Sequence, residues 1–182
     1  GGVFASGGSL SNLMALVAAR ENFGLQCDTS AVILASKDSH VSLIKARRIM
    51  GLPEDSLQTI PTNEFGQISM DHLLNKLTFL KSHEKKCFAI VATAGTTISG
   101  SVDPLIELAE VCNREGMWLH IDGAIGGVFA LSRNTEHIVK GISLADSITL
   151  NPQKLLGITK TSSLLLVANK SVLSSAFSTG LP

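Results

Sequence analysis

The segment that decides the fold begins with HIDGAIGG (residues 120–127) and closes with NPQK (residues 151–154). Within it, Asp122 and Lys154 each follow a short apolar run that is typical of a buried β-strand. In an open α/β sheet, ligands bind in the crevice outside the carboxyl ends of parallel strands. If these two strands are parallel, the carboxylate of Asp122 and the amine of Lys154 meet at such a crevice.

The pairing of this lysine with this aspartate indicates a particular cofactor chemistry. An ammonium group that is removed from water loses its proton readily, so Lys154 could form a Schiff base. Proteins that bind pyridoxal phosphate combine such a lysine with an aspartate at the pyridine nitrogen. Taken alone, however, an aspartate at a strand end is usually a cap or turn residue, and a lysine is usually solvated. The hypothesis therefore depends on the rest of the chain.

Composition limits the class of protein and its partners. The 182 residues are 45% hydrophobic, which is enough for one sizeable core. Fifteen Lys and Arg residues balance fifteen Asp and Glu residues, and the pI is about 7.1. This balance indicates neither a nucleic-acid partner nor a membrane partner, and no apolar run has the length of a membrane span.

The cysteines indicate a cellular compartment. Cys27, Cys87 and Cys112 are odd in number and widely spaced, without a CxxC pair. This pattern favours buried thiols in a reducing compartment over a disulfide framework or a zinc site. We therefore expect a cytoplasmic protein with no metal site.

Both ends of the chain suggest an internal piece of a longer protein. The chain starts with GGVF (residues 1–4), which looks like part of a glycine-rich turn, and has no initiator methionine. It closes at Leu181 and Pro182 without a terminal element.

Apolar runs alternate with helical periodicity along the chain. We expect strands at residues 31–35, 57–60, 87–92, 118–121, 147–150 and 163–167. We expect helices at residues 10–23, 70–80 and 104–115, and one more that ends at Met50; Ser69 and Asp103 are expected to cap two of them. This order predicts one α/β domain with a mainly parallel sheet covered by helices.

Three stretches at strand or helix ends carry candidate site residues. The turn SGGS (residues 6–9) feeds a helix N-terminus, where backbone N–H groups favour an anion, although an ordinary helix entry would need the same residues. His40 follows a strand and could stack on a flat ring, but a histidine there is more often a cap or a satisfied polar group. The hydroxyls of ATAGTT (residues 92–97) could reach a cofactor, or serve packing alone.

Taken together, these stretches resemble the group II pyridoxal-phosphate-dependent amino-acid decarboxylases, which include glutamate, cysteine-sulfinate, 2,4-diaminobutyrate and aromatic-amino-acid decarboxylases. Five motifs appear in the family's order: SGGS with Asn12 and Leu13, SHVS (39–42), ATAGTT with Gly100 and Asp103-Pro104, WLHIDGA (118–124), and NPQK (151–154). Five motifs in this order make a chance match improbable.

The resemblance implies a fold type I transferase architecture, of which residues 1–182 would form most of the large domain, without the N-terminal segment and the C-terminal small domain. Lys154 would carry pyridoxal 5'-phosphate as a Schiff base, Asp122 would pair with the ring nitrogen, and His40 would stack on the ring; these three are the expected catalytic residues. The other expected cofactor-binding residues are Gly7, Gly8, Ser9, Thr97, Ala124, Asn151 and Gln153.

The implied activity is that of a carboxy-lyase that converts an L-amino acid to an amine and carbon dioxide, in a homodimer. The chain departs from the family at Gln153, where the family has His, at Gly123, where it has Ala, and at Ile125, which is often aromatic. Two alternatives stay open. One is another fold type I enzyme, such as a carbon–carbon lyase, desulfurase or aminotransferase, and the other is a non-catalytic paralogue that acts as a dimerisation or regulatory partner.

Overall fold

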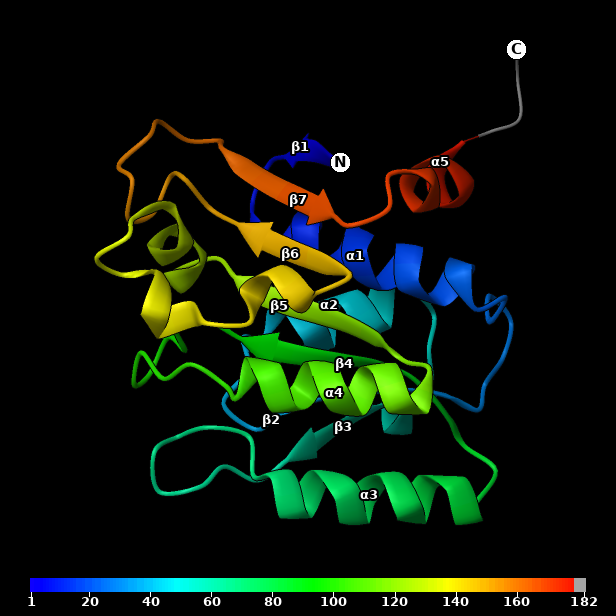
Figure 1. The fold of residues 1–182 in the computed structure, drawn as a ribbon. Helices are drawn as coiled ribbons and strands as arrows, with labels where there is room; N and C mark the ends of the chain where they lie inside the picture. The colour runs from blue at the N-terminus through cyan, green and yellow to red at the C-terminus, as the bar shows by residue number, and fades with distance from the viewer. Residues whose placement is uncertain (179–182) are drawn as a thin grey trace.

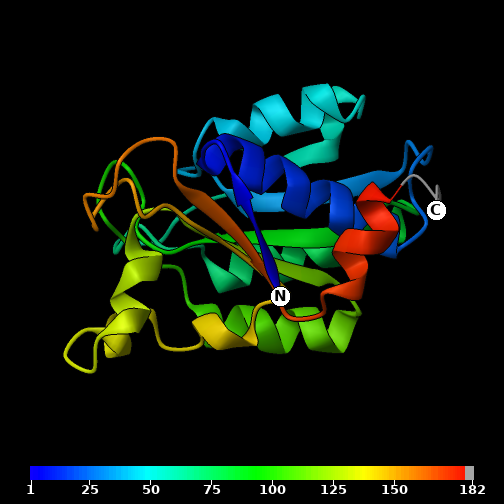
Figure 2. The same ribbon diagram turned by 90° about the horizontal axis from the view of Figure 1, so that it is seen from above.

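The computed structural model describes residues 1–178, in which a sheet lies between two layers of helices (Figures 1 and 2). Leu181 and Pro182, where we expected the chain to break off, lie outside the described residues. The strands are β1 (Gly2–Ala5), β2 (Ala31–Ser36), β3 (Leu57–Ile60), β4 (Lys86–Thr93), β5 (Trp118–Gly123), β6 (Ser147–Leu150) and β7 (Ser163–Val167). The helices are α1 (Gly8–Asn22), α2 (Ser42–Ile49), α3 (Met70–Ser82), α4 (Leu105–Glu115) and α5 (Ser171–Phe177), with short 3-10 helices between them.

The sheet has seven strands in the order β1-β7-β6-β5-β4-β2-β3. The pairs β2/β3, β2/β4, β4/β5 and β5/β6 are parallel, whereas β6/β7 and β1/β7 are antiparallel. The prediction of a mainly parallel α/β sheet is confirmed. Because β4, β5 and β6 are parallel neighbours, the segments that follow them leave the sheet at one edge.

Alternate residues of the central strands pack into two separate cores. Val32 and Leu34 of β2 face α3 and α4, whereas Ile33 and Ala35 face α1, α2 and α5. Figure 2 shows the two layers, with α1 and α2 above the sheet and α3 and α4 below it. Val172 of α5 belongs to the same core as α1 and α2. Strands that are buried on both faces have continuous apolar sequences, which is why β2 and β4 could be found without alternation.

The expectation for the first residues was wrong. Residues Gly2–Ala5 form the edge strand β1, which pairs antiparallel with β7, rather than part of a turn. Strand β1 pairs with a strand more than 150 residues later, with Gly2 opposite Leu166 at one end and Ala5 opposite Ser163 at the other. A stretch rich in glycine has weak strand propensity by itself, so only this partner decides its conformation.

The expected caps of two helices were also wrong. The side chain of Ser69 makes no capping bond to α3 and lies 2.9 Å from His72 Nδ1. Asp103 does not cap α4; its two carboxylate oxygens accept the backbone N–H groups of Ile68 and Thr93, both at 2.7 Å. Asp103 therefore ties three segments together beside the end of β4.

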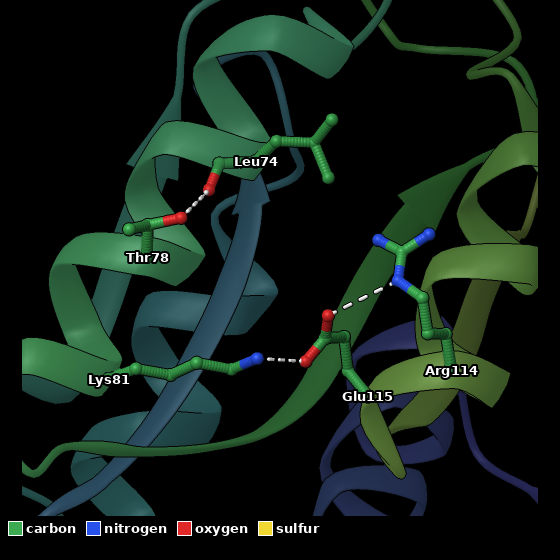
Figure 3. A network of polar contacts seen from close by, with 5 residues as sticks. All are labelled: Leu74, Thr78, Lys81, Arg114 and Glu115. Atoms are coloured by element: carbon green, nitrogen blue, oxygen red, sulfur yellow. Dashed lines mark hydrogen bonds and ion pairs between the residues drawn. The ribbon is translucent and has the colours of Figure 1, made fainter.

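An exposed ion pair joins the C-terminal ends of α3 and α4 (Figure 3). Lys81 of α3 contacts the carboxylate of Glu115, which also accepts Arg114 Nε at 3.3 Å, while Thr78 Oγ1 donates to Leu74 O at 3.0 Å within α3. The Lys81 side chain is 65% exposed and that of Glu115 is 17% exposed. Because water screens the lysine, such a pair contributes about 0–1 kcal/mol to stability. The apolar core between the helices and the sheet is the main stabilising contact.

The three cysteines are free thiols with different environments. Cys112 is buried and Cys87 is half-buried, but Cys27 is exposed, so the expectation of buried thiols was wrong for Cys27. Burial raises the pKa of Cys87 to about 12.

In residues 1–178, no helix combines the length and the apolar character that crossing a bilayer requires.

Candidate active site

A pocket of about 460 Å³ opens at the carboxyl ends of β4, β5 and β6. All ten residues that the sequence singled out line it: Gly7, Gly8, Ser9, His40, Thr97, Asp122, Ala124, Asn151, Gln153 and Lys154. Seven further residues complete the lining: Ser6, Leu10, Asn12, Asp38, Thr93, Gly95 and Ile125. A volume of this size suits a small cofactor or substrate.

Asp122 lies at the end of β5 with only 6% of its surface exposed. Its Oδ2 accepts Asn12 Nδ2 at 2.7 Å, and its Oδ1 accepts the backbone N–H of Ala124 at 3.2 Å. The carboxylate is therefore held by two donors while it still lines the pocket.

The N-terminus of α1 forms the glycine-rich wall of the pocket. The helix begins at Gly8, two residues before the predicted start, and no side chain caps it. A Cβ atom on Gly8 would lie 2.8 Å from Asn151 Nδ2, so glycine allows Asn151 to approach the backbone closely. Asn151 is itself held by the Ser163 hydroxyl. Free N–H groups and the helix dipole make this wall suitable for a phosphate.

Lys154 lies on the loop that follows β6. Its backbone N–H donates to Asn151 O at 3.0 Å, which places it one turn after the strand end. The side chain lines the pocket but is exposed, and no ion pair or hydrogen bond joins its ammonium group to another of residues 1–178. The described residues therefore do not remove this ammonium from water, contrary to the expectation of a desolvated amine.

Gln153 connects the two ends of the loop that carries Lys154. Its Oε1 accepts the backbone N–H of Ser162 at 2.8 Å, and its own N–H points to Ser162 O at 3.5 Å. Gln153 also lines the pocket, and the sequence did not indicate its contact with Ser162.

His40 and Ala124 line the same pocket from two different loops, after β2 and after β5. His40 is exposed, and its Nδ1 accepts the backbone N–H of Ser42 at 3.2 Å. Thr97, on the loop after β4, is exposed and also lines the pocket.

Thr93 lies at the end of β4. The sequence singled out the stretch of residues 92–97 that contains it but did not indicate Thr93 as a site residue. Its Oγ1 is buried and has no hydrogen-bond partner among residues 1–178, although the residue lines the pocket beside Asp122, its neighbour in the sheet register. Buried hydroxyls are normally paired, so this one is suited to a bound group. The sequence signal was its position as the last residue of an apolar strand.

Asn12 was quoted in a motif without a role, and the structure gives it a central position. It is 1% exposed on α1, on the face that also buries Leu16 and Ala19. A polar residue in the apolar stripe of a helix needs a partner, and this signal could have indicated a polar contact but not its identity.

These residues fit an anionic cofactor with a ring. The pocket combines a helix N-terminus for a phosphate, a held carboxylate for a ring nitrogen, an unpaired hydroxyl and one amine. Among residues 1–178, no group of three or more His, Cys, Asp or Glu side chains could hold a metal ion.

Comparisons with known proteins agree with this geometry. A family model described as "Pyridoxal-dependent decarboxylase conserved domain" matches residues 1–180. The chain is 37% identical over 177 residues to cysteine sulfinic acid decarboxylase of Rattus norvegicus, covering 93% of this chain and 36% of that protein. It is 38% identical over 176 residues to aromatic-L-amino-acid decarboxylase of Bacillus atrophaeus, covering 97% of this chain and 37% of that protein.

Among solved structures, the crystal structure of mouse CSAD superposes with a TM-score of 0.95 at 33% sequence identity, covering 100% of this chain and 40% of that chain. The chain thus spans well under half the length of the relatives that it matches.

Proposed function

Because this chain belongs to the pyridoxal-dependent decarboxylase family, we propose that the full-length protein removes the α-carboxylate of an L-amino acid as carbon dioxide, with pyridoxal 5'-phosphate as cofactor. One observation carries the proposal: Lys154, Asp122, His40 and the glycine-rich N-terminus of α1 line one pocket. These residues come from four separate segments, and their meeting is what the chemistry requires.

Each residue has a distinct task in this proposal. The bound cofactor supplies a ring that takes up the electron pair of the breaking carbon–carbon bond. Asp122, held by Asn12 and Ala124, would hold a proton on the ring nitrogen, which would make the ring a better acceptor. Lys154 Nζ would hold the cofactor covalently.

The remaining lining residues position the cofactor. Backbone N–H groups at Gly7, Gly8 and Ser9 bind the phosphate, next to Asn151. His40, Ala124, Thr97 and Gln153 also line the pocket. His40 and Ala124 would hold the ring of the cofactor, and Thr97 and Gln153 would contact its polar groups.

The proposal extends to the assembly and to its location. Residues 1–182 form most of the large domain, and a second identical subunit covers the open side of the pocket. This assembly is supported by the exposed side chains of Ile98 and Leu155, which directly follow the pocket residues Thr97 and Lys154 in sequence, and by that of Ile158 on the same loop as Lys154. Three free thiols are consistent with a reducing compartment, the cytoplasm.

The test uses the full-length protein. Carbon dioxide release is measured across acidic, aromatic and aliphatic amino acids, because the relatives named above act on different side chains. Borohydride reduction followed by peptide mass mapping should find the phosphopyridoxyl group on Lys154. Lys154→Ala should abolish turnover, while Lys160→Ala, a matched change on the same loop, should not.

Two results would contradict the proposal. One is an adduct on Lys160 or another lysine. The other is a full-length protein that binds the cofactor but releases carbon dioxide from none of the amino acids, which would favour the non-catalytic alternative.

A further inference from the structure

A line of buried hydrogen bonds runs from the core to Asp122. Trp118 Nε1 donates to Ser147 Oγ at 2.8 Å, and Ser147 Oγ lies 2.8 Å from His120 Nδ1. His120 Nε2 lies 3.0 Å from Asn12 Oδ1, and Asn12 Nδ2 donates to Asp122 Oδ2 at 2.7 Å. Every member is buried, and His120 is 0% exposed. Of these residues, Trp118, Ser147 and His120 do not line the pocket.

The carboxylate at one end determines the orientation of the Asn12 amide. An ionised carboxylate only accepts hydrogen bonds, so the Asn12 atom that faces Asp122 Oδ2 must be the Nδ2 donor. The same Nδ2 donates to Ser42 Oγ at 2.9 Å. Asn12 Oδ1 then faces His120, and because an amide oxygen only accepts, His120 Nε2 must carry a proton.

His120 is neutral in this environment. Burial lowers the pKa of His120 to about 4, although the Asp122 carboxylate acts in the opposite direction. A neutral ring with its proton on Nε2 leaves Nδ1 as an acceptor for the Ser147 hydroxyl, whose oxygen accepts the Trp118 N–H. Thr149 Oγ1 also approaches Nε2, but at 3.5 Å it is too far for a good hydrogen bond. All donors in the line therefore point towards Asp122.

We propose that His120 is a positioning residue for the decarboxylation reaction: its Nε2–H locks the Asn12 amide, and Asn12 in turn holds the Asp122 carboxylate correctly rotated towards the cofactor nitrogen. This inference rests on the proposed function. A histidine that only serves packing would have its hydrogen bonds satisfied within the core. Here the line of hydrogen bonds ends at Asp122, the only carboxylate in the line, and Asp122 lines the pocket. Hydrogen bonds that point in one direction polarise each other and strengthen the last one.

The first test needs no catalysis. Nitrogen-15 solid-state NMR of the full-length protein labelled in histidine reports the protonation of each ring nitrogen, and the spectrum of His120→Gln identifies the His120 signals by difference. At pH 7 we expect a neutral ring with its proton on Nε2. A proton on Nδ1 alone, or on both nitrogens, would overturn the proposal even in an active enzyme.

The second test separates positioning from packing. His120→Gln places an amide donor near the position of Nε2, so kcat should stay within about threefold of the native value. His120→Phe keeps a ring but removes the donor, so kcat should fall about tenfold or more with little change in KM. Thr149→Val is the matched control, equally buried beside His120, and should change neither.

A double variant shows whether His120 acts through Asp122. In an Asp122→Asn background, His120→Phe should lower kcat by less than about twofold, because the carboxylate that it positions is already lost. A full additional tenfold loss would mean that His120 acts independently of Asp122. If His120→Phe does not fold, the tautomer measured on native protein still decides the question. An inert native protein would reject the proposed decarboxylation and leave the tautomer result standing.

Discussion

Asn12, at the start of α1, donates from Nδ2 to Oδ2 of Asp122, at the end of β5, over a distance of 2.7 Å and 110 residues of chain. This contact joins the glycine-rich wall of the pocket to its carboxylate. Both residues line the same pocket. A direct hydrogen bond therefore connects the anion site to the acid site.

We expect Asp122→Asn to lower turnover far more than cofactor binding. The amide cannot keep a proton on the ring nitrogen, so kcat should fall about a hundredfold or more, whereas the phosphate and Lys154 contacts remain and occupancy should stay nearly normal. Carbon dioxide release and the cofactor absorption band measure the two effects separately. Asp71→Asn, a surface change on α3, is the control. Near-normal turnover of Asp122→Asn would remove Asp122 from its proposed role.

Gln153 is expected to act mainly as an anchor of the Lys154 loop. Gln153→His should change turnover only modestly, by about 1 kcal/mol or less in activation free energy, because it exchanges one neutral hydrogen-bonding group for another. Gln153→Ala leaves the Ser162 N–H without its acceptor and should make the loop more sensitive to proteolysis. Steady-state kinetics and limited proteolysis check these outcomes. An inert native protein that Gln153→His strongly activates would instead indicate a decayed site.

The buried neutral His120 predicts a pH dependence of stability. Its pKa is lowered from 6.5 to about 4 on folding, so between these values the unfolded chain binds a proton that the folded protein does not. The free energy of unfolding that His120 contributes is fully present above pH 6.5 and is lost as the pH falls towards 4. From pH 7 to pH 5, native protein should lose about 2 kcal/mol relative to His120→Gln.

This difference is measured by urea unfolding of both proteins at each pH. Burial raises the pKa of Asp103 to about 6, which acts in the opposite sense, because the folded protein then holds a proton that the unfolded chain has lost. That contribution is common to both proteins and cancels in the comparison. If the free energies of unfolding of the two proteins changed in parallel with pH, the pKa of His120 would not be lowered on folding.

Asp103→Ala should destabilise the fold without altering the pocket lining directly. Its two oxygens satisfy the N–H groups of Ile68 and Thr93, and removing both acceptors leaves two buried donors unpaired, at a cost of about 2–4 kcal/mol. Thermal or urea unfolding measures the loss. Glu107→Ala, in the exposed first turn of α4, serves as the control and should change stability by about 0.5 kcal/mol or less. Equal effects would mean that Asp103 acts only through the helix dipole.

The sequence by itself determined the parallel core of the sheet and the position of the candidate site. Buried parallel strands are continuous apolar runs, so β2, β4, β5 and β6 were found from local pattern, and the residues that follow such strands must meet at one edge. The ten residues selected on this basis and by resemblance all line one pocket. The local sequence pattern was sufficient to find these residues, because each of them lies at the end of a strand or helix that the local pattern predicts.

Only the tertiary structure decided which polar groups pair. The Asn12–His120 and Asn12–Asp122 contacts join residues 108 and 110 positions apart, Asp103 bonds to Ile68 rather than capping its own helix, and Gly2–Ala5 becomes a strand only beside β7. Periodicity indicates that a side chain is buried, but a buried donor takes whichever acceptor the packing of two distant elements brings within 3 Å or so. That choice depends on the packing of α1 against β5 and β6, and no local stretch of the chain contains it.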